Sequence, residues 1–400
     1  MEERVNIYKA TEIIDKTTGP LDAEPVEVML SGGRTLAERM SAWVDLPGAD
    51  VSTLDGFAVR SEDLAGAGPG NEVELEIVGT ASFINPFEDT LTTGQCIEVT
   101  TGSVIPESAD AVVGYEDVED REEKIALKAP VQPGKSIRKR AEEFRMGEFV
   151  AEAGQELTPG WIGLLVAAGY SEVNAIRPPR VTVITTGDEI KLPGGMIETG
   201  QVYASSGAVI VAWCRSMGVT EVRLVVAVDD VFDVQEQMPS PGVSDMVITL
   251  GGTGLSERDV VVEALEEMGA DFLFKGMSVK PGHFTSYALL GNMPVLCLPG
   301  GPSGADAMFQ VLGKRMVKNL MGRIKLDLPS HPAILAEDIK AHDDMDSLYR
   351  IRLEKGDDGI TASPLSGSVH RDIAMTDGFV HVPAGTEIKK GERVPVWVSG

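Results

Sequence analysis

The spacing of apolar and polar residues changes several times along this chain. Residues 1–47 read as helical pieces interrupted by TTGP and LSGGRTL. Residues 48–130 contain short alternating runs, such as NEVELEIVGTASF, separated by Gly, Pro, Asp and Thr turns. Because a period of two is typical of strands, residues 48–130 are predicted to form a β-rich domain.

The next segment, residues 131–178, contains one strong helix signal. In TPGWIGLLVAAGY, Thr158 is placed to act as N-cap, Pro159 occupies the first helical position and Gly169 marks the C-terminal stop. This arrangement of Pro at the start and Gly at the end is typical of helix boundaries.

From residue 179 to about 326, strand and helix patterns alternate. The strand Val181–Thr185 is followed by a helix near SSGAVIVAWCRSMG, and the strands EVRLVVAV, DMVITL and NMPVLCL are each followed by a helical pattern. Such alternation predicts a parallel sheet with helices on both faces, which binds ligands at the carboxyl ends of its strands. Residues 327–400 return to short strands and predict a small β-domain.

The stretch ITLGGTGLSERD places unusually bare backbone directly after a predicted strand. Ser256 is placed to cap the next helix, with Asp259 at the third helical position in a capping box, and the loop itself comprises Gly251, Gly252, Thr253 and Gly254. A helix N-terminus beside such a loop is suited to an anion. A tight strand-to-helix turn without a ligand explains the same residues.

Composition and charge narrow the class of protein. The chain has 400 residues, 43% hydrophobic and 24% charged, and a formal net charge of -27. We therefore expect a multidomain globular protein with no nucleic-acid partner and no anionic membrane partner. The three cysteines and five histidines show no metal-ligand spacing. Without a signal peptide or an apolar span, a cytoplasmic location is expected.

Polar residues follow several predicted strands or turns. The candidates for a functional site are Asp55 in LDGFA, Thr100 and Thr101 in TTGS, Asp188 and Glu189 in TGDE, Lys280 in VKPG, and Pro299 and Gly300 in LPGGP. Taken singly, each of these residues can also be explained as a turn or capping residue without a ligand. Together, acids, a cation and bare backbone suit a Mg²⁺-assisted reaction of a phosphate or oxyanion ligand.

The motifs LDGFA, TTGSVIPESADAVV, RVTVITTGDEI, VKPG and LPGGP, in this order, resemble the molybdopterin molybdenumtransferase family, which includes the C-terminal module of gephyrin. The resemblance implies an α/β fold with added β-domains. Its parts would be an elongated helical linker and dimerisation domain (1–47 and 131–178), a β-rich domain (48–130), an α/β molybdopterin-binding domain (179–326) and a C-terminal β-barrel (327–400).

The resemblance also implies an activity: molybdenum from molybdate enters adenylylated molybdopterin, with Mg²⁺-dependent release of AMP. In a homodimer, the catalytic residue Asp55 and Thr100 or Thr101 would lie on the partner side of a cleft. The α/β side would carry Glu189, Asp259 and Lys280 as catalytic residues, with Asp188 and Glu189 holding Mg²⁺. The cofactor-binding residues would be Thr100, Thr101, Gly251, Gly252, Thr253, Gly254, Ser256, Lys275, Pro299 and Gly300, and the molybdopterin adenylyltransferase is a candidate partner.

Several motifs depart from the family pattern. GGVSVG is replaced by GGTGLSERD, PGNP by PGGP with Gly301, and PGK by PGH with His283. Two alternatives therefore stay open: a diverged paralogue that makes or hydrolyses the adenylate without inserting metal, and a non-catalytic scaffold. Tungstate is an alternative to molybdate, because the two oxyanions are similar in size and charge.

Overall fold

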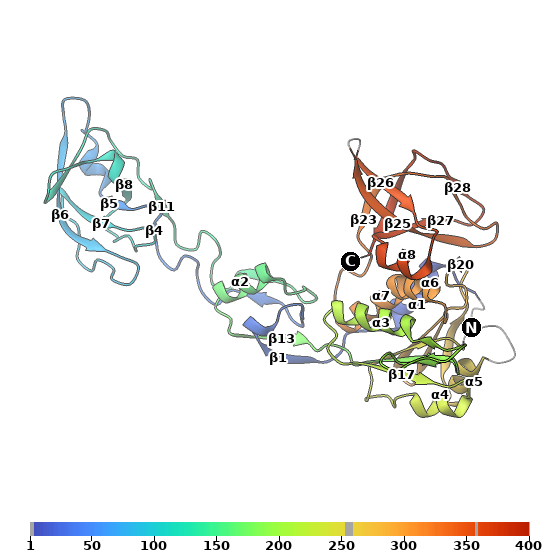
Figure 1. Ribbon diagram of the computed structural model, residues 1–400. Helices are drawn as coiled ribbons and strands as arrows, with labels where there is room; N and C mark the ends of the chain where they lie inside the picture. The colour runs from blue at the N-terminus through green and yellow to red at the C-terminus, as the bar shows by residue number, and fades with distance from the viewer. Residues whose placement is uncertain (1–3, 253–258, 357–358, 400) are drawn as a thin grey trace.

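The computed structural model describes residues 4–252, 259–356 and 359–399 of the chain. The molecule is elongated, with a small β-rich body at one end and a large body carrying both chain termini at the other (Figure 1). A narrow region around α2 (Pro159–Ala167) joins the two. The boundaries of the four expected domains stay predictions.

The large body is built on a six-stranded sheet. Its strands lie in the order β17 (Val222–Ala227), β14 (Val181–Thr186), β18 (Met246–Leu250), β22 (Met293–Leu298), β21 (Ser286–Leu290) and β19 (Asp271–Lys275). The first four are parallel, as expected, whereas β21 is antiparallel to both of its neighbours. The sheet is therefore mixed, because β21 reaches β22 through a short turn with no crossover helix.

Helices cover both faces of this sheet. The helices are α1 (Ile7–Thr17), α3 (Ser205–Ser216), α4 (Val231–Gln237), α5 (Val260–Glu267), α6 (Pro302–Met308) and α7 (Lys314–Leu320). In β18, Ile248 packs in the core beneath α1, α3, α6 and α7, and Val247 packs in the core beneath α4 and α5. Successive residues of a strand point to opposite faces, so a continuous apolar strand serves both cores.

The narrow region, here called the linker region, is mostly strands. Its elements are β1 (Ala23–Glu27), β2 (Thr35–Leu36), β3 (Met40–Ser41), β12 (Phe149–Ala151), β13 (Glu172–Ile176) and α2. The prediction of helical pieces in residues 1–47 and 131–178 is confirmed at α1 and α2 but is wrong for the strands of the linker region, because pairing of β1 and β2 with β13 makes a sheet there. For α2 itself, the Thr158 N-cap, Pro159 at the helix start and Gly169 at φ 100° confirm the predicted boundaries.

The β-rich body, here called the distal module, is confirmed as strands. Its six-stranded sheet has the order β8 (Ala111–Gly114), β5 (Gly56–Val59), β7 (Gln95–Val99), β6 (Val73–Ala81), β10 (Lys124–Leu127) and β9 (Glu119–Asp120). A two-stranded sheet of β4 (Val51–Ser52) and β11 (Ile137–Arg138) leads back to the linker region.

The C-terminal part forms a closed five-stranded barrel. Its strands are β25 (Asp346–Gly356), β26 (Gly359–Pro364), β23 (Ser330–Leu335), β29 (Arg393–Val398) and β27 (Gly378–Val382), and β27 closes the ring by pairing with β25. The α/β body adds β20 (Val279–Lys280) beside β25, so that Lys280 is paired with Ser347 of the barrel. Short elements complete this part and the α/β body: β24 (Ile339–Lys340), β28 (Glu387–Ile388), α8 (Val369–Met375), β15 (Ile190–Lys191) and β16 (Val202–Tyr203).

All three cysteines are buried and free of disulfides. None of the helices in the described ranges is long and apolar enough to cross a membrane.

Candidate functional site

The carboxyl ends of three neighbouring strands bring their loops together. Strand β14 leads to Asp188 and Glu189, β18 leads to Gly251, and β22 leads to Gly300. The backbone N–H of Gly251 donates to the Leu298 carbonyl at 3.2 Å. The loops therefore form one edge, as expected for a ligand site of an α/β sheet.

Close backbone approach explains the glycines at this edge. Gly251 has φ 94°, and a Cβ atom there would lie 2.8 Å from the Thr186 carbonyl oxygen. A Cβ atom on Gly300 would lie 3.2 Å from the Gly251 Cα. Both glycines thus keep the adjoining loops packed together, and both leave backbone uncovered by side chains.

The carboxylates after β14 meet a further acidic segment. The backbone N–H of Asp229 donates to the Asp188 carboxylate at 3.2 Å, which brings the loops after β14 and β17 into contact. Glu189 lies against Gly187, where a Cβ atom would come within 2.6 Å of the Glu189 carboxylate. The sequence analysis did not identify Asp229, although Asp229 follows the strand β17 just as Asp188 and Glu189 follow β14.

Asp259 lies at the start of α5 and not within it. The helix begins at Val260, so Asp259 is its N-cap residue; the predicted capping box with Asp259 at the third helical position is wrong. Burial raises the pKa of Asp259 to about 7, while the Val262 backbone N–H and Lys275 act in the opposite direction. One carboxylate oxygen, Oδ1, is buried without a hydrogen-bond partner in the described part of the chain. Thr253, Gly254 and Ser256, which were expected to bind the ligand here, lie outside the described residues.

Lys275 is held beside this carboxyl group. Its ammonium pairs with Glu266 of α5 and lies 4.5 Å from the Phe272 ring centroid. The charge of Lys275 lowers the pKa of Asp259, against the larger effect of burial. The structure thus brings two of the predicted residues together at the end of the sheet.

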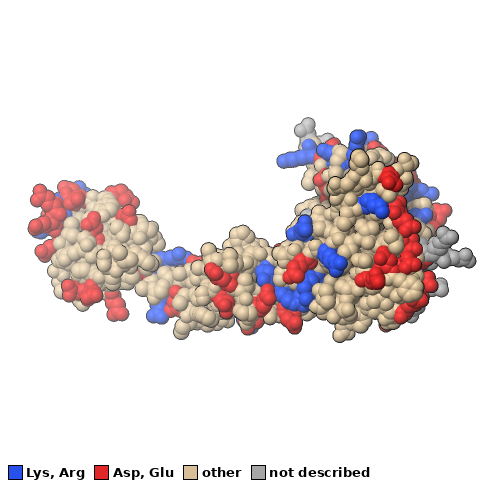
Figure 2. All heavy atoms as spheres, turned by 60° about the horizontal axis from the view of Figure 1, so that its bottom comes forward, with Lys and Arg blue, Asp and Glu red and all other residues tan. Residues whose placement is uncertain are grey.

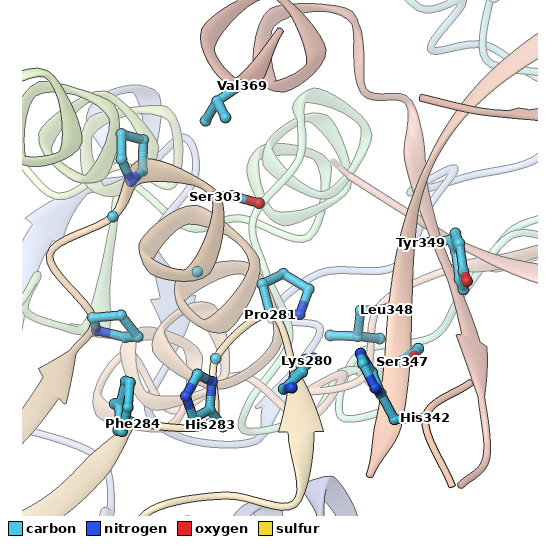
Figure 3. Close-up of a pocket in the computed structure, with 15 residues that line it drawn as sticks. Lys280, Pro281, His283, Phe284, Ser303, His342, Ser347, Leu348, Tyr349 and Val369 are labelled. Carbon is cyan, nitrogen blue, oxygen red and sulfur yellow. The ribbon is translucent and has the colours of Figure 1, made fainter. Parts of the chain in front are cut away.

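Lys280 and Pro299 line a cavity of about 570 Å³ between the α/β body and the barrel. The loops after β20 and β22 form one wall, and the barrel strand β25 forms another (Figure 3). Sequence reasoning identified Lys280 and Pro299 and noted His283, but it missed Ser303, His342, Ser347 and Tyr349. The last three come from the barrel, and no local motif marks them.

The cavity carries positive charge near its α/β wall. In Figure 3, Lys280 lies between His283 and His342. Burial lowers the pKa of His283, and the nearby charges of Lys280 and Arg4 lower it further. Lys280 also lines this wall, and its ammonium group can pair with an oxyanion.

The cavity is held in place by a buried ion pair. Arg350 of β25 donates to the Asp306 carboxylate of α6 at 2.6 Å and to the Ser303 carbonyl at 2.8 Å. Trp213 of α3 donates to the same carboxylate at 2.8 Å. These bonds fix the barrel against the helix that begins at the cavity.

Asp55, Thr100 and Thr101 lie in the distal module, far from these residues in the same chain (Figure 1). The Asp55 carboxylate accepts hydrogen bonds from the Thr101 backbone N–H at 2.6 Å and from its hydroxyl at 2.9 Å. These bonds lower the pKa of Asp55, the backbone bond most strongly. Thr100 instead contacts Ser103, with 3.1 Å between their hydroxyl oxygens, so the hydrogen-bonded pair is Asp55 and Thr101.

The donor set at the sheet edge fits Mg²⁺. Asp188 and Glu189 offer carboxylate oxygens, and Mg²⁺ commonly takes one or two carboxylates and completes its shell with water and substrate phosphates. No group of three or more His, Cys, Asp or Glu side chains arranged to hold a metal occurs within the described ranges.

Comparisons with known proteins match three successive parts of the chain. Residues 5–169 match the MoeA N-terminal region (domain I and II), residues 182–319 a probable molybdopterin binding domain, and residues 332–398 the MoeA C-terminal region (domain IV). These matches define the class: a protein with a probable molybdopterin binding domain between the N-terminal and C-terminal regions of the MoeA type.

Relatives match over nearly the whole length. The molybdopterin molybdenumtransferase of Staphylococcus epidermidis is 30% identical over 371 residues, which cover 91% of this chain and 88% of the relative. The molybdopterin molybdenumtransferase of Staphylococcus aureus strain COL is 29% identical over 399 residues, which cover 98% of this chain and 95% of the relative. A crystal structure of the MoeA protein from Pyrococcus horikoshii has a TM-score of 0.86 and 27% identity, with 100% of both chains covered. The chain belongs to the molybdopterin molybdenumtransferase family, which confirms the resemblance seen in the motifs.

Proposed function

We propose that this chain acts in molybdenum cofactor biosynthesis, as a transferase that moves molybdenum from molybdate to adenylylated molybdopterin and releases AMP. The names of its full-length relatives support this activity. The observation that carries it furthest is that the glycine loops at Gly251 and Gly300, the carboxylates of Asp188 and Glu189, and the N-cap residue Asp259 all follow strands that end at one edge of the sheet.

Each part of the edge has a role in this proposal. The glycine loops at Gly251 and Gly300, together with Thr253, Gly254 and Ser256, receive the phosphate-bearing part of the pterin. Asp188 and Glu189 hold Mg²⁺, which neutralises phosphate charge when it is bound. Lys280 holds an oxyanion in the adjoining cavity, either molybdate or phosphate.

Asp259 is placed to move a proton. When the adenylate is hydrolysed, the oxygen of water forms a bond to phosphorus, the bridging phosphorus–oxygen bond breaks and water loses a proton. A carboxyl group with a pKa of about 7 can accept that proton near neutral pH and return it to the leaving oxygen.

The site is completed by the distal module of a second copy in this proposal. Asp55 and Thr101 lie at the far end of the elongated chain, which supports a homodimer whose cleft is shared. Lys275, beside Asp259, adds a cation for the phosphate. A cytoplasmic location and transfer of substrate from a molybdopterin adenylyltransferase are parts of the same proposal.

The activity is tested with adenylylated molybdopterin, Mg²⁺ and molybdate, by following AMP release and formation of active cofactor. We expect both products from the unmodified chain and a 10- to 100-fold loss in Lys280→Gln, since one charge-assisted contact is worth about 1.5–3 kcal/mol. Lys340→Gln, at an exposed lysine of the barrel, is the control. AMP release without active cofactor would contradict molybdenum insertion and favour an adenylate hydrolase.

A further inference from the structure

The cavity between the α/β body and the barrel is lined by bases and hydroxyl groups but by no described acid. Its lining includes Lys280, His283 and His342, together with Ser303 and Ser347, and none of its described residues is Asp or Glu. The rest of the molecule is different, because the chain has 62 acidic and 35 basic residues, and acidic side chains are spread over both ends of it in Figure 2. The cavity is therefore a local exception that suits an anion.

The carboxylates of the elements around the cavity are engaged elsewhere or point into solvent. Asp346 of β25 lies 2.8 Å from Nε2 of His381 and accepts a hydrogen bond from the Ala384 backbone N–H at 3.0 Å. The buried carboxylate of α6 is held by the ion pair with β25 described above. Two exposed acids follow His342 in the barrel loop without lining the cavity, and these are Asp343 and Asp344.

The donors of the cavity come from both of its walls. Lys280 ends β20, His283 lies three residues later in the same loop, and His342 belongs to the barrel loop between β24 and β25 (Figure 3). Within the described part of the chain, no hydrogen bond or ion pair engages these three side chains. The Tyr349 hydroxyl, in contrast, donates to the Lys340 carbonyl at 2.6 Å. The lysine and the two histidines are therefore the nitrogen donors that a ligand can use.

Packing fixes the position of His283. Its ring lies against the ring of Phe284, with 3.8 Å between the centroids, and its carbonyl accepts a hydrogen bond from the Met277 backbone N–H at 2.9 Å. The preceding residue, Gly282, has φ 123°, and a Cβ atom there would clash with the Met308 side chain of α6. The loop is therefore packed closely on α6, which holds the imidazole at the wall of the cavity.

The charge of His283 depends on its surroundings. Burial lowers the pKa of His283, and the positive charges of Lys280 and Arg4 lower it further, so the neutral imidazole is favoured at neutral pH. An anion in the cavity acts in the opposite direction, because a neighbouring negative charge stabilises the imidazolium. The protonated ring also donates hydrogen bonds from both nitrogens, whereas the neutral ring donates from one. Binding of an anion and uptake of a proton therefore favour each other.

We propose that His283 and His342 bind a tetrahedral oxyanion together with Lys280, and that His283 takes up a proton from solvent as the anion binds. This inference rests on the proposed function, which has an oxyanion at Lys280, and it adds the barrel as a second binding wall. His283 stands where the family motif PGK has a lysine. A lysine keeps its charge into the alkaline range, whereas a histidine titrates near neutral pH. The affinity of this chain for the oxyanion should therefore rise as the pH falls.

The test is calorimetric titration of the full chain with molybdate and, in a parallel arm, with sulfate, at pH 6.5 and pH 8 and constant ionic strength. Both anions stay doubly charged in this range, so a change in affinity belongs to the protein. Titrations in two buffers with different heats of ionisation give the number of protons taken up. We expect binding that is roughly threefold to tenfold tighter at pH 6.5, with uptake of up to about one proton per anion.

Three variants separate the roles of the two histidines. His283→Gln should bind equally well at both pH values and take up no proton. His283→Lys should bind at pH 8 at least as tightly as the unmodified chain does at pH 6.5, because its cation no longer titrates in this range. His342→Ala should weaken binding roughly threefold to tenfold at both pH values and keep the proton uptake. His331→Gln, at an exposed histidine of β23, is the control and should bind as the unmodified chain does.

Several results would overturn the inference. Proton uptake that persists in His283→Gln, or equal affinities of the unmodified chain at the two pH values, would remove the role of His283. Unchanged binding in His342→Ala would remove the barrel wall from the site. Each of these results leaves the proposed function standing. If neither anion binds the unmodified chain at millimolar concentration, the oxyanion role of Lys280 in the proposed function fails together with this inference.

Discussion

Asp259 shows how one residue acquires chemistry that its identity does not reveal. The sequence marks it as an acid near a helix start, which is a common capping arrangement. The structure adds burial, which raises its pKa to about 7, and leaves one carboxylate oxygen without a hydrogen-bond partner among the described residues. Sequence reasoning could identify the side chain but not its protonation state, since that depends on packing between distant segments.

The raised pKa of Asp259 predicts a pH-dependent effect on stability. Its pKa is higher in the folded chain than in the unfolded chain, so folding takes up a proton between about pH 4 and pH 7. Stability is therefore lost as the pH rises through that window. Asp259→Asn should raise the melting temperature by roughly 2–4 °C at pH 8 and leave it unchanged at pH 4. Equal melting temperatures of the two chains at pH 8 would contradict a buried, protonated carboxyl group.

At the scale of elements, the sequence predicted long periodic segments better than short paired strands. The α/β alternation and the boundaries of α2 were correct because periodicity and capping are local signals. The linker region was predicted to be helical because β2 and β3 are only two residues long and carry no period of their own. Their conformation is set by partners that lie more than 100 residues later in the chain.

The loop after β18 gives a prediction about backbone geometry. Gly251→Ala places a Cβ atom 2.8 Å from the Thr186 carbonyl oxygen and requires φ 94°, which a residue with a side chain adopts at a cost of about 1–3 kcal/mol. We expect a lower melting temperature and weaker binding of adenylylated molybdopterin by the folded fraction. Gly195→Ala is the control, because no atom lies within 4 Å of its added Cβ. An unchanged affinity for adenylylated molybdopterin would show that this loop forms a turn and does not bind the ligand.

The ion pair between β25 and α6 gives a second prediction at this scale. Arg350→Leu leaves Asp306 buried without its cation, which typically costs about 3–5 kcal/mol. The barrel should then be cut more readily by a protease, and the chain should unfold at a lower temperature. Arg352→Leu, on the same strand, removes an arginine that is 43% exposed and should change little. Equal effects of the two variants would contradict a docking role for Arg350.

At the scale of the whole molecule, the elongated shape separates residues that the proposed reaction uses together. Asp55 and Thr101 lie in the distal module, and Glu189 and Lys280 lie in the large body (Figure 1). The family motifs predicted these residues as members of one cleft, but only a three-dimensional arrangement reveals that one chain holds the two groups apart. In the proposed homodimer, the distal module of a second copy would supply Asp55 and Thr101 to this cleft.

Mixing two inactive chains tests this account most directly. Asp55→Ala and Glu189→Gln should each lose molybdenum insertion, measured as active cofactor formed from adenylylated molybdopterin, Mg²⁺ and molybdate. In a heterodimer of the two variants, one of the two clefts combines an intact distal module with an intact α/β edge. We predict that the heterodimer regains about half of the unmodified activity. If heterodimers isolated with two different tags stay inactive, the cleft is not shared between subunits and the account is contradicted.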